Sequence, residues 1–355
     1  MKNEEGARLK KRKRHLVVGL LSVIFIFFVV PMTISVIVYE KQFGSRNETP
    51  QHLKYEVSEF ENLEQTPAQF KSNKGQLLAG YVYTNTEMLH PNGVIIVAHG
   101  LGAGHNTYLP EIAYMTENGY TVFAYDGTGN DESAGKSIKG LPQAVIDLDY
   151  AINYVKNDEQ FDGLPIMLYG HSLGGYAAIA VLNHHPDITA VVERSGFYES
   201  TDLIDELGSQ VVGPFFHLLK PYISLYEHIK FGEYASLNGL EVLANTNANV
   251  MFMHSKDDEV ISYDQHFAKY ESLFGTRGNF KFISYNHRGH DVVVDETLSQ
   301  TIRAQIKEYG TYQELPEDIR MMYDDALYDL EHRLDISVMQ QIIDFYNQWV
   351  VKEYE

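Results

Sequence analysis

The chain has 355 residues, of which 44% are hydrophobic and 21% charged, so it is long enough for a sizeable core in one large domain or two small ones. It contains no cysteine, which excludes disulfides, thiolate metal sites and a cysteine nucleophile. The first 14 residues hold seven basic and two acidic side chains, so the remainder has 21 basic and 46 acidic side chains, a net charge of −25. Because such a charge is repelled by phosphate groups, we expect no nucleic-acid partner.

The N-terminal segment predicts a membrane anchor. A basic cluster over residues 10–14 precedes residues 16–38, which carry no charge. As a helix these 23 residues span about 35 Å, enough to cross a bilayer core. A cleaved signal peptide is the alternative, but its apolar region would be shorter, about 7–15 residues, and end at a small-residue cleavage site. Neither feature is visible in this sequence.

The position of the basic cluster predicts the topology of the chain. Positively charged flanks stay in the cytoplasm, so we expect residues 1–15 to be cytoplasmic and residues 16–38 to cross the cell membrane once. Residues 39–65 are polar and are expected to form a stalk, with residues 66–355 as an extracellular domain.

Beyond residue 65, apolar strand patterns alternate with helical patterns. Residue 70 and residues 76–83 predict a hairpin, and further strands are expected at 94–98, 120–125, 165–169, 190–193, 250–253 and 280–285. Helices are expected at 109–118, 142–156 and 336–351, and directly after residue 172. This alternation is typical of a mostly parallel sheet flanked by helices.

Two further stretches have helical patterns between these elements. Residues 197–248 are rich in aromatic side chains, and we expect a helical cap whose aromatics either line a substrate pocket or pack the cap onto the sheet. Residues 296–333 are polar and acidic, and we expect a helical insertion exposed to solvent.

The strand at 165–169 runs into Gly170, Ser172 and Gly174, which form the pattern G-x-S-x-G. A serine nucleophile on such a turn needs a strained backbone, and the two glycines let strand and helix pass closely. The following helix points its N-terminus at the serine, which makes the Leu173 N–H a candidate oxyanion donor. Glycines after the strand at 94–98 make the Leu101 N–H a second candidate.

An acid and a histidine follow the last two predicted strands. Asp258 comes after the first of these strands and His290 after the second, which completes the chain order Ser, Asp, His. In such a triad the histidine takes the serine proton, and the aspartate fixes the histidine tautomer. Asp257 and His287 are rival candidates for the same two roles.

With these residues in place, residues 68–295 resemble the α/β-hydrolase superfamily, in particular its bacterial lysophospholipase-like and serine aminopeptidase-like members. The resemblance rests on His99 and Gly100 for the oxyanion loop, residues 170–174 for the serine turn, residues 255–261 for the acid segment, and Gly289 with His290 for the histidine turn. It favours Asp258, because residues 259–261 then match the family pattern, and His290, because this histidine directly follows a glycine.

The resemblance implies an α/β-hydrolase fold and a serine hydrolase that cleaves carboxylic esters through an acyl-enzyme, without a metal or an organic cofactor. A serine peptidase or acyltransferase on the same triad is the alternative, and a non-catalytic binding or scaffold module is the alternative from another class. The anchor beside lipid makes amphiphilic esters, such as monoacylglycerols or lysolipids, the expected substrates. The expected partners are a small-molecule or lipid ester substrate and, through residues 16–38, the membrane.

Overall fold

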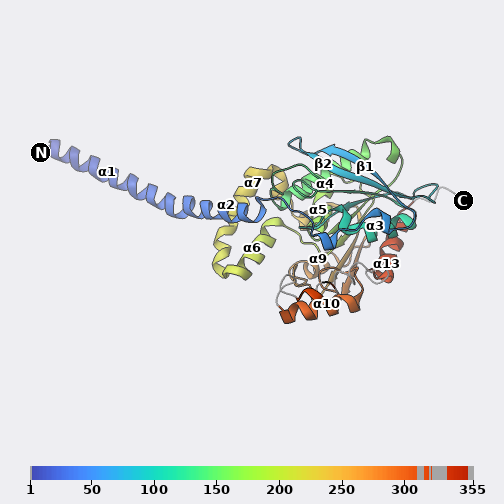
Figure 1. Cartoon of the computed structure of the whole chain (residues 1–355). Helices are drawn as coiled ribbons and strands as arrows, with labels where there is room; N and C mark the ends of the chain where they lie inside the picture. Colours follow the sequence, from blue (N-terminus) through green and yellow to red (C-terminus); the bar gives the residue numbers. More distant parts are fainter. Residues whose placement is uncertain (1, 310–315, 320, 322–333, 351–355) are drawn as a thin grey trace.

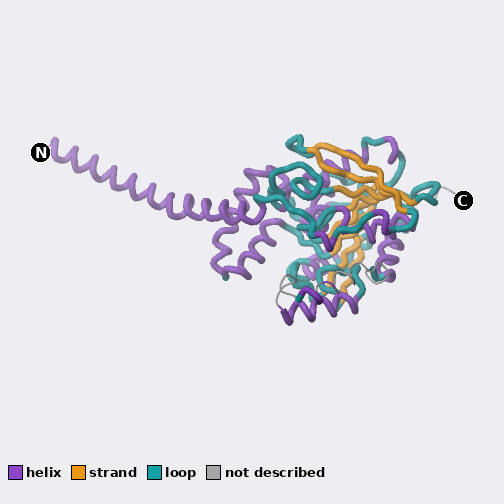
Figure 2. The backbone as a smooth tube through the Cα atoms, viewed as in Figure 1, coloured by secondary structure: helices purple, strands orange, loops and turns teal. Residues whose placement is uncertain are grey.

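A computed structural model describes residues 2–309, 316–319, 321 and 334–350, and these are organised around one eight-stranded sheet (Figures 1 and 2). The strand order is β1-β2-β4-β3-β5-β6-β7-β8. The hairpin strands β1 and β2 run antiparallel, and all pairs from β4 to β8 are parallel. The strands are β1 (Leu63–Lys71), β2 (Leu77–Asn85), β3 (Val94–Ala98), β4 (Thr121–Tyr125), β5 (Ile166–His171), β6 (Ala190–Arg194), β7 (Asn249–Ser255) and β8 (Phe280–Tyr285). The expected mostly parallel sheet is therefore confirmed.

Helices cover both faces of this sheet. On one face lie α4 (Leu141–Lys156), α5 (Leu173–Ala180) and α9 (Phe267–Phe274), and on the other lie α3 (Leu109–Glu117) and α13 (Ile336–Asn347). The side chains of β3 alternate accordingly: Val94 and Ile96 belong to the first core, whereas Ile95 and Val97 belong to the second. Burial on both faces explains why the central strands are continuous apolar runs.

The cap expected between β6 and β7 is helical in the structure. It contains α6 (Ser200–Val212), the short 3₁₀ segment η7 (Pro214–Leu219), α7 (Lys220–Phe231) and α8 (Gly239–Asn245). The second expected insertion begins with α10 (Glu296–Tyr309), and most of its remainder lies outside the described residues.

The N-terminal helix is continuous through α1 (Lys2–Ile24), a π-helical turn (Phe25–Val29) and α2 (Val30–Phe43), and it projects from the domain (Figure 1). Within it, Lys10–Phe43 is long and apolar enough to cross a membrane, and its most apolar part is almost entirely exposed.

Residues 39–65 differ from the expected polar stalk, because they pack against the domain. Tyr39 and Phe43, one helical turn apart, are 2% and 4% exposed, and the Tyr39 hydroxyl donates to Glu227 of α7. Arg46 donates to the backbone carbonyls of Asp131, Ser133 and Gly135. The sequence analysis expected a stalk because the segment is polar on average. That average does not reveal the few aromatic side chains that pack against the domain.

The serine turn joins β5 to α5 with very close backbone contacts. A Cβ atom on Gly170 would overlap the carbonyl of Gly174, and a Cβ on Gly174 would overlap the carbonyl of Ala98 in β3. The need for small residues at these two positions, expected from the motif, is therefore confirmed.

A buried carboxyl group, Glu193, occupies the end of β6. Burial raises its pKa from 4.5 to about 7, although the charge of His254 and the N–H of Gly196 act in the opposite direction. The folded protein therefore retains a proton on Glu193 at pH values where an unfolded chain has lost it.

We expect Gly174→Ala to destabilise the fold by on the order of 1–3 kcal/mol, because α5 must move away from β3. Equilibrium urea unfolding of the detergent-solubilised chain would measure this. Gly278→Ala is the control, since a Cβ on Gly278 meets no atom within 4 Å. Equal stabilities of the two variants would contradict the close approach.

We expect Glu193→Gln to gain stability relative to the wild type as the pH rises from about 4.5 to about 7, by on the order of 3 kcal/mol. Over this window the unfolded wild type releases a proton that the folded wild type keeps, so the wild type loses folding free energy. Urea unfolding at both ends of the window measures the difference. The exposed Glu241→Gln is the control, and a difference that does not depend on pH would refute the expectation.

Candidate functional site

Ser172 lies on the strained turn between β5 and α5. Its backbone angles are φ 56° and ψ −116°, a combination that is rare for a residue with a side chain. The turn is held by its backbone, because the Ser172 N–H donates to the Arg194 carbonyl at 2.8 Å and its carbonyl accepts from the Tyr176 N–H. Ser172 is 9% exposed, and within the described part of the chain its hydroxyl makes no hydrogen bond.

Asp258 and His290 form a partly buried pair, in which the carboxylate is fully buried and the imidazole is 21% exposed. The His290 Nδ1–H donates to Asp258 Oδ2 at 2.8 Å, and the N–H groups of Val260 and Ile261 donate to the other carboxylate oxygen at 2.8 and 3.0 Å. Burial alone would raise the pKa of Asp258, but hydrogen bonds and charge from His254 and His290 bring it well below its usual range. The carboxylate therefore stays ionised and fixes the tautomer of His290.

The rival candidates have other partners. Asp257 Oδ1 accepts hydrogen bonds from the Gly289 N–H at 3.0 Å and from the Ser255 hydroxyl at 2.6 Å. The His287 side chain is 65% exposed and lies 3.8 Å from Asp257. Asp257 thus holds the backbone of the histidine turn, whereas Asp258 contacts the imidazole of His290.

The pair lies beside the serine turn. The rings of His290 and His171, the residue before Ser172, have centroids 4.9 Å apart. Within the described residues, no hydrogen bond joins the Ser172 hydroxyl to His290. The structure therefore brings Asp258 and His290 into contact and places them next to Ser172, but without a hydrogen bond between Ser172 and His290. Such hydrogen bonds are often long or poorly aligned before substrate binds.

A buried hydrogen-bond chain, which the sequence analysis missed, connects the three loops of the site. The Gly100 N–H donates to the Tyr108 hydroxyl at 2.9 Å, this hydroxyl donates to His171 Nδ1 at 2.9 Å, and His171 Nε2 donates to the His290 carbonyl at 3.3 Å. Burial, the charge of Arg194 and the proximity of His290 hold the pKa of His171 well below its usual value. A neutral imidazole has the one donor and one acceptor that this chain requires.

Arg194 at the end of β6 contacts the histidine turn through an ion pair. Its guanidinium is 1% exposed and forms ion pairs with Asp291 at 2.5 Å and Glu111 at 3.6 Å. One sequence signal could have identified Arg194: a charged residue at the end of an apolar strand.

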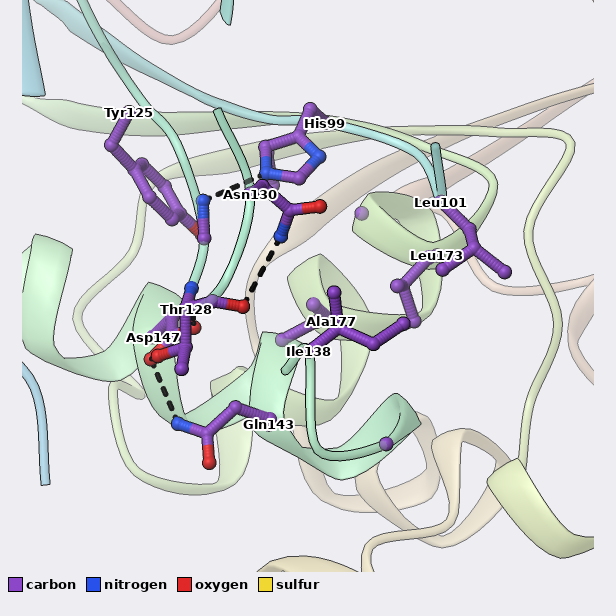
Figure 3. Close-up of a pocket in the computed structure, with 15 residues that line it drawn as sticks. His99, Leu101, Tyr125, Thr128, Asn130, Ile138, Gln143, Asp147, Leu173 and Ala177 are labelled. Atoms are coloured by element: carbon purple, nitrogen blue, oxygen red, sulfur yellow. Dashed lines mark hydrogen bonds between the residues drawn. The ribbon is translucent and has the colours of Figure 1, made fainter. Parts of the chain in front are cut away.

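The two candidate oxyanion donors, Leu101 and Leu173, line one cavity of about 30 Å³ (Figure 3). This is enough for about one water molecule. Leu173 is the first residue of α5, where backbone N–H groups lack partners within the helix. Figure 3 shows Leu101, Leu173, Ile138 and Ala177 on the apolar side of the cavity, and Thr128, Asn130, Gln143 and Asp147 on its polar side.

The cap aromatics Phe216 and Phe231 are buried, and neither is among the residues that line this cavity. Across residues 2–309, 316–319, 321 and 334–350, no group of three or more His, Asp or Glu side chains is arranged to hold a metal ion.

Known protein families and proteins resemble this chain in sequence. The family model described as serine aminopeptidase, S33 matches residues 89–238. An uncharacterised protein, R595 of Acanthamoeba polyphaga mimivirus, is 27% identical over 59% of this chain and 70% of its own length. Human monoglyceride lipase is 32% identical over 118 residues, which are 33% of this chain and 36% of the lipase.

Solved structures share the fold. The Pyrococcus furiosus esterase Pf2001 superposes with a TM-score of 0.56 at 15% identity, over 86% of this chain and 99% of the esterase. A Pyrococcus horikoshii acylaminoacyl peptidase superposes with a TM-score of 0.52 at 17% identity, over 84% of this chain and 44% of the peptidase. The sheet order, the strained serine turn and these structures lead to one conclusion: the chain has the α/β-hydrolase fold, and its residues 89–238 match the serine aminopeptidase, S33 family model.

Proposed function

We propose that this protein is a membrane-anchored serine hydrolase that cleaves carboxylic esters. The observation that carries the proposal is the hydrogen-bonded Asp258–His290 pair beside the strained turn of Ser172. The names of the esterase and lipase relatives support ester hydrolysis in general. The proposal assigns the triad to Ser172, Asp258 and His290, and the oxyanion hole to the N–H groups of Leu101 and Leu173.

In this reaction the Ser172 oxygen attacks the ester carbonyl carbon while His290 Nε2 takes the hydroxyl proton. The negative charge that develops on the carbonyl oxygen is stabilised by the Leu101 and Leu173 N–H groups. The carbon–oxygen bond to the alcohol breaks, and the alcohol leaves with the proton from His290. Water, activated by the same histidine, then releases the acid and restores Ser172.

The apolar helix favours a substrate at a membrane. The proposal places residues 16–38 across the cell membrane, the N-terminus in the cytoplasm and the domain outside, with monoacylglycerols or lysolipids as substrates. The similarity to a monoglyceride lipase agrees with this class. A peptidase on the same triad is the second candidate, because the matching family model is described as a serine aminopeptidase.

We expect a fluorophosphonate probe to label the full chain, and Ser172→Ala to abolish labelling, because only an activated serine attacks the probe. Gel fluorescence of the labelled protein measures this. The exposed Ser272→Ala is the matched control and should label like the wild type. Absence of labelling in correctly folded wild type would favour the binding-module alternative.

We expect Asp258→Asn and His290→Ala to lower kcat/KM for a soluble ester by about 10⁴-fold. Asp257→Asn retains the oxygen that accepts from Gly289, and His287 is exposed, so Asp257→Asn and His287→Ala should cost less than about tenfold. A large loss in the second pair with little loss in the first would reverse the assignment.

We expect esters of medium and long acyl chains to be cleaved faster than acetyl esters, and esters faster than the matching amides, if lipids are the substrates. A chromogenic panel of acyl lengths and of aminoacyl amides measures both ratios. A sharp preference for acetyl would refute the lipid assignment, and a preference for amides would favour the peptidase.

A further inference from the structure

The cap packs along the apolar N-terminal helix. The Tyr222 hydroxyl of α7 donates to the Phe27 carbonyl, and the rings of Tyr222 and Phe28 meet edge to face at 6.1 Å. Further along the same helix, Tyr226 stacks edge to face on Tyr39 at 5.4 Å. Figure 1 shows α6 and α7 flanking the domain end of this helix.

The depth of these contacts follows from the length of the helix. The basic residues 10–14 cannot enter the hydrocarbon, so a span begins at about Leu16 and needs about 20 residues, which places its other end at about Ser35. A span from Leu16 to Phe27 would measure only about 18 Å, against a core of about 30 Å. Tyr222 therefore lies about 12 Å inside the outer edge of the hydrocarbon.

The tip of the cap has the composition of a membrane-inserted segment. Residues 207–219 contain no Asp, Glu, Lys or Arg, in a chain whose net charge is −20. Within this tip the exposed fractions are 84% for Val211, 64% for Val212, 81% for Phe215 and 69% for Leu218. Exposing these apolar side chains to water is unfavourable, whereas placing them in lipid is favourable.

The charged side chains nearest to the tip are paired. Lys220 forms an ion pair with Asp202, and His217 lies 2.8 Å from Asp205. Pairing lowers the cost of holding these groups inside the hydrocarbon beside Tyr222. The charges on the cap therefore do not oppose its approach to a lipid surface.

We propose that the cap hairpin from α6 through η7 to α7 inserts its apolar tip, residues 207–219, into the outer leaflet beside the anchor. The occupant of this surface is a phospholipid bilayer. The inference rests on the proposed membrane anchor and extends it from one helix to the cap.

The absence of cysteine in the chain allows a direct test with single labels. Phe215→Cys, Val211→Cys, Phe25→Cys and Leu89→Cys are each labelled with the fluorophore NBD in the full chain. The variants are reconstituted into phosphatidylcholine vesicles that carry spin-labelled phosphatidylcholine as a quencher. Leu89 is the control, since it is 89% exposed and lies in the loop before the amino end of β3, whereas the cap follows the carboxyl end of β6.

The labels on Phe215→Cys and Val211→Cys are expected to shift to shorter wavelength and to lose emission to the lipid quencher, as the label on Phe25→Cys does, while the label on Leu89→Cys does not. If Phe25→Cys is quenched but the cap positions behave like Leu89→Cys, the anchor stands and the cap proposal is overturned. If Phe25→Cys is not quenched, the anchor itself is wrong and both fail. A blue shift at the cap without lipid quenching would indicate a second copy of the chain and would also overturn the proposal.

Discussion

The close approach of α5 to β3 and β5 is the constraint on which the site depends. With no room for a side chain at Gly170 or Gly174, the chain must reverse within a few residues, and Ser172 takes up the strained conformation. Such backbone strain costs on the order of 1–3 kcal/mol, and it persists because α5, β3 and the four central residues of β5 are buried around it. The same reversal directs the N-terminus of α5 at the serine, so the proposed nucleophile and the candidate oxyanion donor come from one turn.

A second layer of buried polar contacts sets the other loops against this turn. Tyr108 and His171 connect the backbone of the loop after β3 to the backbone of the histidine turn, and Arg194 holds Asp291. In a low-dielectric interior such hydrogen bonds are strong, and leaving any one partner unsatisfied is costly. The loops after β3, β5, β6 and β8 therefore have one favoured arrangement, which is what a preorganised site requires.

The N-terminal helix is part of the same packing, because it continues into the domain without a flexible break. Tyr39 contacts Gly140, which lines the cavity beside Leu101 and Leu173, and it also donates to Glu227 of the cap. The N-terminal helix, the cap and the wall of the cavity thus meet at one aromatic side chain, Tyr39. If the helix spans a bilayer, the orientation of the whole domain relative to the membrane is set by this contact rather than by a linker.

The sequence by itself determined the sheet, the serine turn and the apolar helix, because hydrophobic periodicity and glycine spacing act through local backbone geometry. It also predicted Asp258 and His290 as candidate site residues, since they follow the last two strands and parallel strands end at one edge of a sheet. It did not identify the docking of Tyr39 and Phe43 in a polar segment, the role of Asp257 in holding Gly289, or the chain through His171. These contacts join residues far apart in the chain, and only the packing of the complete fold decides which of them meet.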